Sequence, residues 1–274
     1  MEGSRLLVEG STLSMIGKAR VVLHREVEGR MKTCTIIRDI DQWYACITVE
    51  KGAAEILPSS KPSVGVDLGV NPVAALSDGI ILPAPRLLKK SETEIKSLQR
   101  TLSRKQKGSK NREKAKIALE KSWRRLRNSR NNFAHKTSRF FADNYGTIAF
   151  EDLKIQNMVK NHHLASAILD ASWGKTRQLT AYKAERRGGR VILVEPRGTS
   201  QECSGCGKVV AKVLSERTHS CPFCGLELDR HVNAARNILA RGLEQAPVET
   251  EPLPVIRIGK VGRGSKKPTD PSRG

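Results

Sequence analysis

The sequence contains few aromatic residues and no apolar run that approaches a membrane-spanning length. Phe, Trp and Tyr make up 4% of the 274 residues, and charged residues interrupt each apolar stretch. A transmembrane helix needs about 20 consecutive apolar residues. Residues 1–4 also lack the basic-then-apolar pattern of a secretory signal peptide. These features predict a cytoplasmic protein that is not associated with a membrane.

Cysteine and acidic residues are also scarce. Six cysteines are too few for a disulfide scaffold, and four of them form two CxxC pairs, which favours a reducing compartment and a bound metal. The 49 Lys and Arg residues outnumber the 28 Asp and Glu residues, so the formal charge is +21. Such a charge favours a polyanionic partner. Nucleic acid is the first expectation, and an anionic membrane or basicity that serves only solubility are the alternatives.

Most of the excess charge lies in residues 86–140, which hold 19 Lys and Arg residues and four Asp and Glu residues. Apolar residues recur there at helical spacing, and Gly108-Ser109 divides the pattern into two runs. We predict a basic helical hairpin with one apolar seam, or alternatively a solvated charged coiled coil. The seam would contain Leu119, Trp123, Leu126, Phe133 and Phe140. The candidate nucleic-acid-binding residues are Arg100, Arg104, Lys107, Lys110, Arg124, Arg125 and Arg127.

The rest of the chain alternates between strands and helices, which indicates an α/β protein. β-Branched and aromatic runs predict strands within residues 12–50 and at 64–67, 73–76, 80–82, 147–151 and 191–195. Helices are expected at 165–187 and 233–239. Cys34 and Cys46 would be buried on their strands. Residues 243–274 have little periodicity and are predicted to be disordered.

Two cysteine pairs give the most specific local signal. Cys203 and Cys206 precede Cys221 and Cys224 by a gap of 14 residues, and glycines follow or interrupt each pair. Two such turns can place four thiolates tetrahedrally around Zn²⁺. Because protein would fill all four positions, the zinc would be structural. Redox-active pairs are the alternative.

Carboxylates end two of the predicted buried strands. Asp67 closes the first, two residues before Gly69, and Glu151 closes another. A buried carboxylate is costly unless it is paired or metal-bound, so these two could hold one or two Mg²⁺ ions for phosphodiester hydrolysis. Asp229 and His231 are candidates to complete the site. The alternatives are ordinary ones: Asp67 or Asp229 as caps, Glu151 paired with an Arg, and His231 packed in the core.

These motifs occur in one order and resemble the TnpB family, the OrfB-type transposases now described as RNA-guided DNA endonucleases. They are Val64-Gly65-Val66-Asp67-Leu68-Gly69-Val70, Phe150-Glu151-Asp152-Leu153, Thr199-Ser200-Gln201, the four cysteines, and Asp229 to Ile238. The resemblance implies a RuvC-like, RNase H-type mixed sheet with catalytic Asp67 and Glu151. It also implies guide RNA and DNA as partners, zinc and magnesium as cofactors, and a role in DNA recombination by a transposable element. The same resemblance implies a prokaryotic cell and association with its nucleoid.

The resemblance also implies a division of the chain. A partial, wedge-like β-barrel would occupy residues 1–60, and the chain would begin inside that barrel. The nuclease domain would comprise residues 61–85, 144–200 and 226–242, interrupted by the basic hairpin (86–143) and the zinc ribbon (201–225), with the tail from 243.

His231 departs from the family pattern, which has Asp there. An imidazole supplies no negative charge and prefers softer ions than Mg²⁺, so impaired cleavage is expected. The alternatives to a nuclease are therefore a guided DNA-binding protein that does not cut, a truncated transposase remnant, and a general basic nucleic-acid binder.

Overall fold

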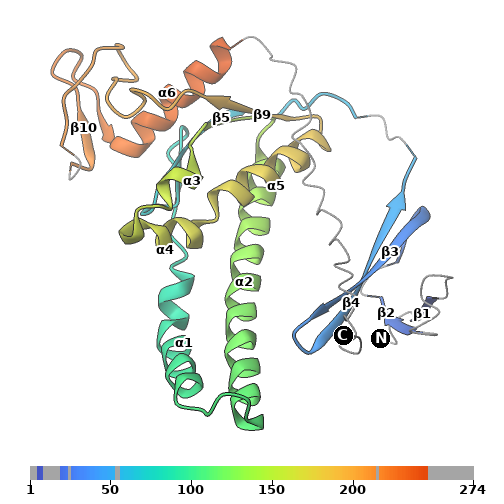
Figure 1. Ribbon diagram of the computed structural model, residues 1–274. Helices are drawn as coiled ribbons and strands as arrows, with labels where there is room; N and C mark the ends of the chain where they lie inside the picture. Colours follow the sequence, from blue (N-terminus) through green and yellow to red (C-terminus); the bar gives the residue numbers. More distant parts are fainter. Residues whose placement is uncertain (1–4, 9–18, 24–25, 53–55, 214–215, 246–274) are drawn as a thin grey trace, which may run out of the picture.

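The computed structural model describes residues 5–8, 19–23, 26–52, 56–213 and 216–245. Its centre is a five-stranded mixed sheet in the order β7-β6-β5-β8-β9 (Figure 1). β5 pairs antiparallel with β6 and parallel with β8, and β8 pairs parallel with β9. The strands are β5 (Ser63–Leu68), β6 (Ala74–Leu76), β7 (Ile81–Leu82), β8 (Thr147–Glu151) and β9 (Arg190–Val194).

Helices cover both faces of this sheet. One face holds Val64, Val66, Ile148 and Phe150, all fully buried, and packs on α2 and α5. The other face receives α6, whose Ile238 packs with Ala149 and Val194. The helices are α1 (Leu87–Ser103), α2 (Lys110–Asn144), α3 (Ile155–Met158), α4 (His162–Ala171), α5 (Trp173–Glu185) and α6 (Arg230–Glu244). None of the described helices is long and apolar enough to cross a membrane.

The basic helical hairpin is confirmed. α1 and α2 run side by side away from the sheet (Figure 1), and α2 begins where Ser109 caps it by accepting from the Arg112 N–H. The prediction of the apolar seam is partly wrong, because Trp123 is 41% exposed. The buried residues of α2 are mostly small ones, such as Ser122 and Ala134, so its neighbours pack close to its backbone. Trp123 follows Ser122 and is therefore turned about 100° away from that stripe.

The helix predicted at 165–187 is two helices. Ser172 lies between α4 and α5 with a left-handed backbone (φ 53°). The turn lets Trp173 enter the core, where it is 2% exposed and its Nε1–H donates to the Gly69 carbonyl over 3.2 Å. Because the turn at Ser172 allows the Trp173 indole to be buried, the chain does not continue there as one helix, although the sequence predicts one. The helix predicted at 233–239 is also longer than expected and forms α6.

The N-terminal strands form two separate pairs, β1 (Arg5–Val8) with β2 (Ala19–Val22), and β3 (Arg30–Asp39) with β4 (Gln42–Glu50). The barrel for residues 1–60 remains a prediction. The expected burial of Cys34 and Cys46 is wrong, because both are exposed. Among the described residues no further strand pairs with β3 or β4, and most residues of the two strands are exposed. The tail predicted from residue 243 lies outside the described residues after Gln245.

A glycine sets the distance between α6 and the sheet. A Cβ on Gly65 of β5 would stand 2.0 Å from the Ala235 carbonyl oxygen and 2.6 Å from the Leu239 nitrogen, both backbone atoms of α6. On the same helix, a Cβ on Gly242 would stand 2.8 Å from Ala149 of β8. The backbone of α6 therefore lies directly on β5 and β8, without an intervening side chain.

We expect Gly65→Ala to lower the free energy of unfolding by about 3 kcal/mol, because the added methyl must push α6 away from the sheet. Chemical denaturation measures the change. Gly52→Ala is the matched control, since nothing lies within 4 Å of a Cβ there, and its effect should stay within about 0.5 kcal/mol. Equal effects of the two substitutions would contradict the close approach of α6.

Candidate functional site

Strand alternation places Asp67 and Glu151 on one face of the sheet. Successive side chains of a strand point to opposite faces, so Asp67 shares the face of Gly65, and Glu151 shares that of Ala149. Gly65 pairs with Ala149 in the parallel register of β5 and β8. Two residues further along, Asp67 and Glu151 end neighbouring strands at the same edge. The structure thus brings together the two carboxylates that the sequence predicted.

Both carboxylates open into a cleft of about 370 Å³. Its other walls come from the segments after β5 and β8, the loop after β9 and the first turns of α6. These walls include Gly69, Leu153, Pro196, Thr199, Ser200, Arg230, His231 and Ala234. The cleft therefore has an acidic floor on the sheet and a rim of polar and basic groups.

His231 and Asp229 have different places at the start of α6. The His231 Nδ1 lies 2.8 Å from the Asp67 Oδ2, inside the cleft. Asp229 is the N-cap of α6, and its Oδ1 accepts from the backbone N–H groups of His231 (2.8 Å) and Val232 (3.3 Å). Of the two candidates, His231 joins the carboxylates and Asp229 orients the helix that carries it.

The surroundings of Glu151 oppose its ionisation. Its side chain is almost completely buried, and this burial, with the nearby charge of Asp67, raises the pKa of Glu151 to about 7. A hydrogen bond donated by the Thr199 hydroxyl acts in the opposite direction. Burial outweighs that bond, so Glu151 is close to half protonated at neutral pH. A bound cation would favour the ionised form and relieve this cost.

Sequence reasoning missed three residues that build the cleft, namely Thr199, Asn233 and Asn237. The Asn237 Nδ2 donates to the carbonyls of Thr199 (2.9 Å) and Glu202 (2.8 Å). The fully buried Asn233 donates to the Glu202 carbonyl (2.7 Å) and accepts from the Ser204 N–H (2.9 Å). These bonds tie the loop after β9 to α6. Two asparagines four residues apart beside Ala and Ile were the available signal.

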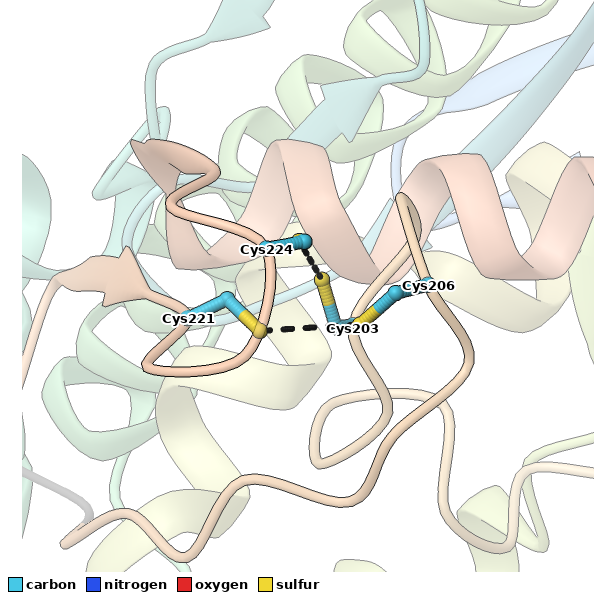
Figure 2. A group of neighbouring side chains, drawn as sticks. All are labelled: Cys203, Cys206, Cys221 and Cys224. Atoms are coloured by element: carbon cyan, nitrogen blue, oxygen red, sulfur yellow. Dashed lines mark hydrogen bonds between the residues drawn. The ribbon is translucent and has the colours of Figure 1, made fainter.

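The four predicted cysteines converge on one point (Figure 2). Their sulfurs all lie within 4.8 Å of one another, the only such group of ligands among the described residues. Two close contacts cross between the pairs: Cys203 to Cys224 and Cys206 to Cys221, each 3.6 Å. Sulfurs about 2.3 Å from one tetrahedral ion stand about 3.8 Å apart, so the group could hold a metal ion. A redox pair would instead bring together the sulfurs of one CxxC turn.

The two CxxC turns have matching backbones, which explains the glycines. Gly207 and Gly225 both have φ of +72°, and each donates to the carbonyl of the first cysteine of its own turn at 2.9 Å. Only glycine adopts this conformation without strain. β10 (Thr218–Ser220) and β11 (Glu227–Asp229) pair antiparallel beside the second turn and lead directly into α6.

The candidate nucleic-acid-binding residues separate into two groups. Arg100, Arg104, Lys107 and Lys110 surround the α1–α2 turn and make no side-chain hydrogen bond or ion pair with any described residue. The other three are engaged along the helices. Arg125 pairs with Glu94 of α1, while Arg124 and Arg127 bind Asp41 and Asp39 of the β3–β4 turn. The free charge is therefore concentrated at the tip of the hairpin.

Two family models match most of the described chain. Residues 46–162 match the OrfB model of IS605 elements, described as "Probable transposase", and residues 173–238 match the TNB domain of Cas12f1-like proteins. InsQ of Escherichia coli (strain K12) is 34% identical over 259 residues, or 88% of this chain. The chain is therefore similar to TnpB/OrfB proteins over most of its described length. InsQ is provisionally named an RNA-guided DNA endonuclease.

Other relatives of this chain carry similar names. A provisionally named RNA-guided DNA endonuclease of Streptomyces pristinaespiralis is 34% identical over 86% of the chain. The CRISPR-associated endodeoxyribonuclease Cas12f1 of Sulfoacidibacillus thermotolerans is 27% identical over 85%. The chain spans 64%, 59% and 59% of these three relatives. A solved CRISPR-Cas12f ternary complex, at 22% identity, covers 72% of this chain and 41% of its own with a TM-score of 0.49, too low to establish a shared fold.

We expect Glu151→Gln to stabilise the protein at pH 8 in buffer without added Mg²⁺. The folded-state pKa of about 7 lies above the ordinary value of 4.5, so the cost of the ionised form is absent below pH 4.5 and reaches its full size above pH 7. The gain should be at most about 3 kcal/mol at pH 8 and vanish at pH 4.5. Chemical denaturation of both proteins at the two pH values measures it, and a gain independent of pH would contradict the assigned cause.

We expect one zinc ion per chain in freshly purified, reduced protein, measured by elemental analysis. Cys221→Ser should reduce the zinc content well below one, because it removes one of four ligands. Cys34→Ser is the matched control, since Cys34 is exposed on β3 away from the cluster, and it should keep the full content. Wild-type protein without zinc, or a Cys221→Ser variant with undiminished zinc, would refute the assignment.

Proposed function

We propose that this chain supplies the RuvC-like nuclease domain of a TnpB-type RNA-guided DNA endonuclease. The supporting observation is the pairing of Asp67 and Glu151 at the ends of adjacent parallel strands, inside a cleft that His231 also lines. The free cations at the tip of the α1–α2 hairpin suit a nucleic-acid backbone. The names of the TnpB and Cas12f1 relatives agree with guide RNA and DNA as partners.

The residues of the cleft fit a divalent cation. Carboxylate oxygens are the ligands that Mg²⁺ prefers, and the cost of ionising the buried Glu151 would be relieved by positive charge beside it. Asp67 and Glu151 would hold the ion, which supplies an activated water and stabilises the leaving oxygen. The four-cysteine cluster would hold Zn²⁺ and keep the loop after β9 in place.

Residues around the two carboxylates act by positioning them. His231 contacts Asp67 Oδ2 and leaves the Oδ1 for a ligand. The Thr199 hydroxyl donates to one oxygen of Glu151 and leaves the second. The Arg177 guanidinium donates to the Glu151 carbonyl over 3.1 Å and fixes the end of β8. Each carboxylate therefore has one oxygen that is bonded to a side chain of the protein, and its second oxygen could bind a cation.

A second function follows from His231. An imidazole in contact with Asp67 brings no negative charge, so the site has two carboxylates where the family pattern has three. A guided DNA-binding protein that occupies its target without cutting is consistent with that loss. Both the predicted impairment of cleavage and the DNA-binding alternative depend on His231. One cleavage assay can distinguish them.

We expect the purified chain, with the RNA that co-purifies when its flanking DNA is co-expressed, to cleave a matched duplex in Mg²⁺ or Mn²⁺. Asp67→Asn should reduce the rate by at least about 100-fold, because it removes a charge that positions the cation. Glu244→Gln, an exposed carboxylate at the end of α6, should change the rate less than about twofold.

His231→Asp decides between the two functions. Under the nuclease proposal both the wild-type protein and this variant cut the duplex, and the variant is faster in Mg²⁺ because it supplies an oxygen ligand. Cleavage by His231→Asp alone, with equal target binding by both proteins, would refute the nuclease proposal for the native chain and establish the DNA-binding function.

A further inference from the structure

A second cleft lies beside the carboxylate cleft. It has about the same volume, 370 Å³, and is formed by the loop after β5, the start of α1 and the end of α4. Its polar walls include Asn71, Arg86, Lys89 and Ser166, and its apolar surface includes Val70, Pro85 and Ala167. A cleft of this size accommodates a small organic ligand.

One short loop separates the two clefts. Leu68 and Gly69 line the carboxylate cleft, while Val70 and Asn71 line the second one. The loop is held from both sides, because the Gly69 carbonyl accepts from Trp173 and the Asn71 carbonyl accepts from Arg217 over 3.4 Å. Asp67 and Val70 are three Cα–Cα steps apart, so the clefts lie within about 11 Å of each other along the chain.

The second cleft contains two basic side chains that form no ion pair, although Lys89, after Lys96, helps to lower the pKa of the Glu92 carboxyl. Its two acidic residues are already paired: Asp170 binds Arg130 at 2.7 Å and accepts from the Leu88 N–H at 2.8 Å, and Glu92 pairs with Lys96 at 2.5 Å. Its two basic residues are not. Across the described ranges, neither the Arg86 guanidinium nor the Lys89 ammonium makes a hydrogen bond or an ion pair.

The buried Asp170 makes this arrangement rigid. Asp170 belongs to α4 and is 6% exposed. Its carboxylate accepts from the Leu88 N–H in the first turn of α1 and from the Arg130 guanidinium of α2. Three helices therefore meet at one carboxylate directly behind the cleft. Arg86 and Lys89 are held on a fixed wall, with their charged groups exposed and without a partner.

We propose that this cleft is the subsite for the nucleotide that flanks the scissile phosphodiester of the DNA strand. Arg86 and Lys89 bind its phosphate, the amide of Asn71 and the hydroxyl of Ser166 reach its polar edges, and the apolar surface accepts the sugar and base. The inference rests on the proposed function, because it takes the carboxylate cleft as the place of cleavage. The ligand is a nucleotide unit within a strand, and a free mononucleotide is the other source of the same chemistry.

Binding of a fluorescein-labelled, ten-nucleotide single-stranded DNA, with no Mg²⁺ added, tests the subsite without cleavage. The logarithm of the binding constant falls linearly with the logarithm of the salt concentration. Arg86→Gln and Lys89→Gln should each make this slope less steep by about 0.7, the value for one phosphate contact to a single strand. Lys90→Gln is the matched control, since it removes the same charge from the next residue, which is exposed and does not line the cleft. Its salt dependence should equal that of the wild type.

Ala167→Leu tests occupancy without a change of charge. The larger side chain narrows the cleft and should abolish photo-cross-linking of a 4-thiothymidine-containing strand to the peptide around Arg86. Thermal unfolding shows whether each variant is folded. A deoxynucleoside monophosphate at millimolar concentration is then added as a competitor. If it removes the cross-link but leaves overall strand binding unchanged, the cleft binds a free nucleotide and the strand assignment is overturned.

The failure of this inference differs from failure of the proposed function. A wild-type protein that binds and cross-links as expected but never cuts would refute the nuclease and leave the subsite in place. Folded Arg86→Gln, Lys89→Gln and Ala167→Leu variants that bind, cross-link and cut as Lys90→Gln does would overturn the subsite and leave the nuclease in place.

Discussion

The close approach of α6 to β5 is the constraint on which the site depends. With no side chain at Gly65, the helix backbone lies against the strand, and its first turn carries His231 to within 2.8 Å of Asp67. The same helix fixes the loop after β9 through Asn233 and Asn237. A single glycine thus determines the depth of the carboxylate cleft and the positions of two of its walls.

Much of the fold could be predicted because strand alternation and helical spacing are local. The strands that carry Asp67 and Glu151 were predicted nearly residue by residue, and Gly108-Ser109 marked the turn of the basic hairpin. The break at Ser172, the exposure of Trp123 and the exposure of Cys34 depend on which element packs on which, and no local pattern contains that information. The four cysteines were found because metal ligation imposes a spacing, whereas Thr199 acts through a contact with Glu151, 48 residues away.

Net charge alone did not identify the binding surface. Arg124 and Arg127 look as available in the sequence as Arg104 does, but the carboxylates of the β3–β4 turn neutralise them. Exposed ion pairs of this kind contribute little stability, yet they determine which cations remain for a polyanion. Cations without an ion pair do lie at the hairpin tip and on the wall beside Asn71, at opposite ends of α1.

The Asp67–His231 contact joins residues 164 positions apart, and this separation has a consequence during synthesis. The first carboxylate leaves the ribosome long before the helix that covers it, and the cysteine cluster is made between them. A nascent chain has no covered cleft until almost the last described residue has been translated.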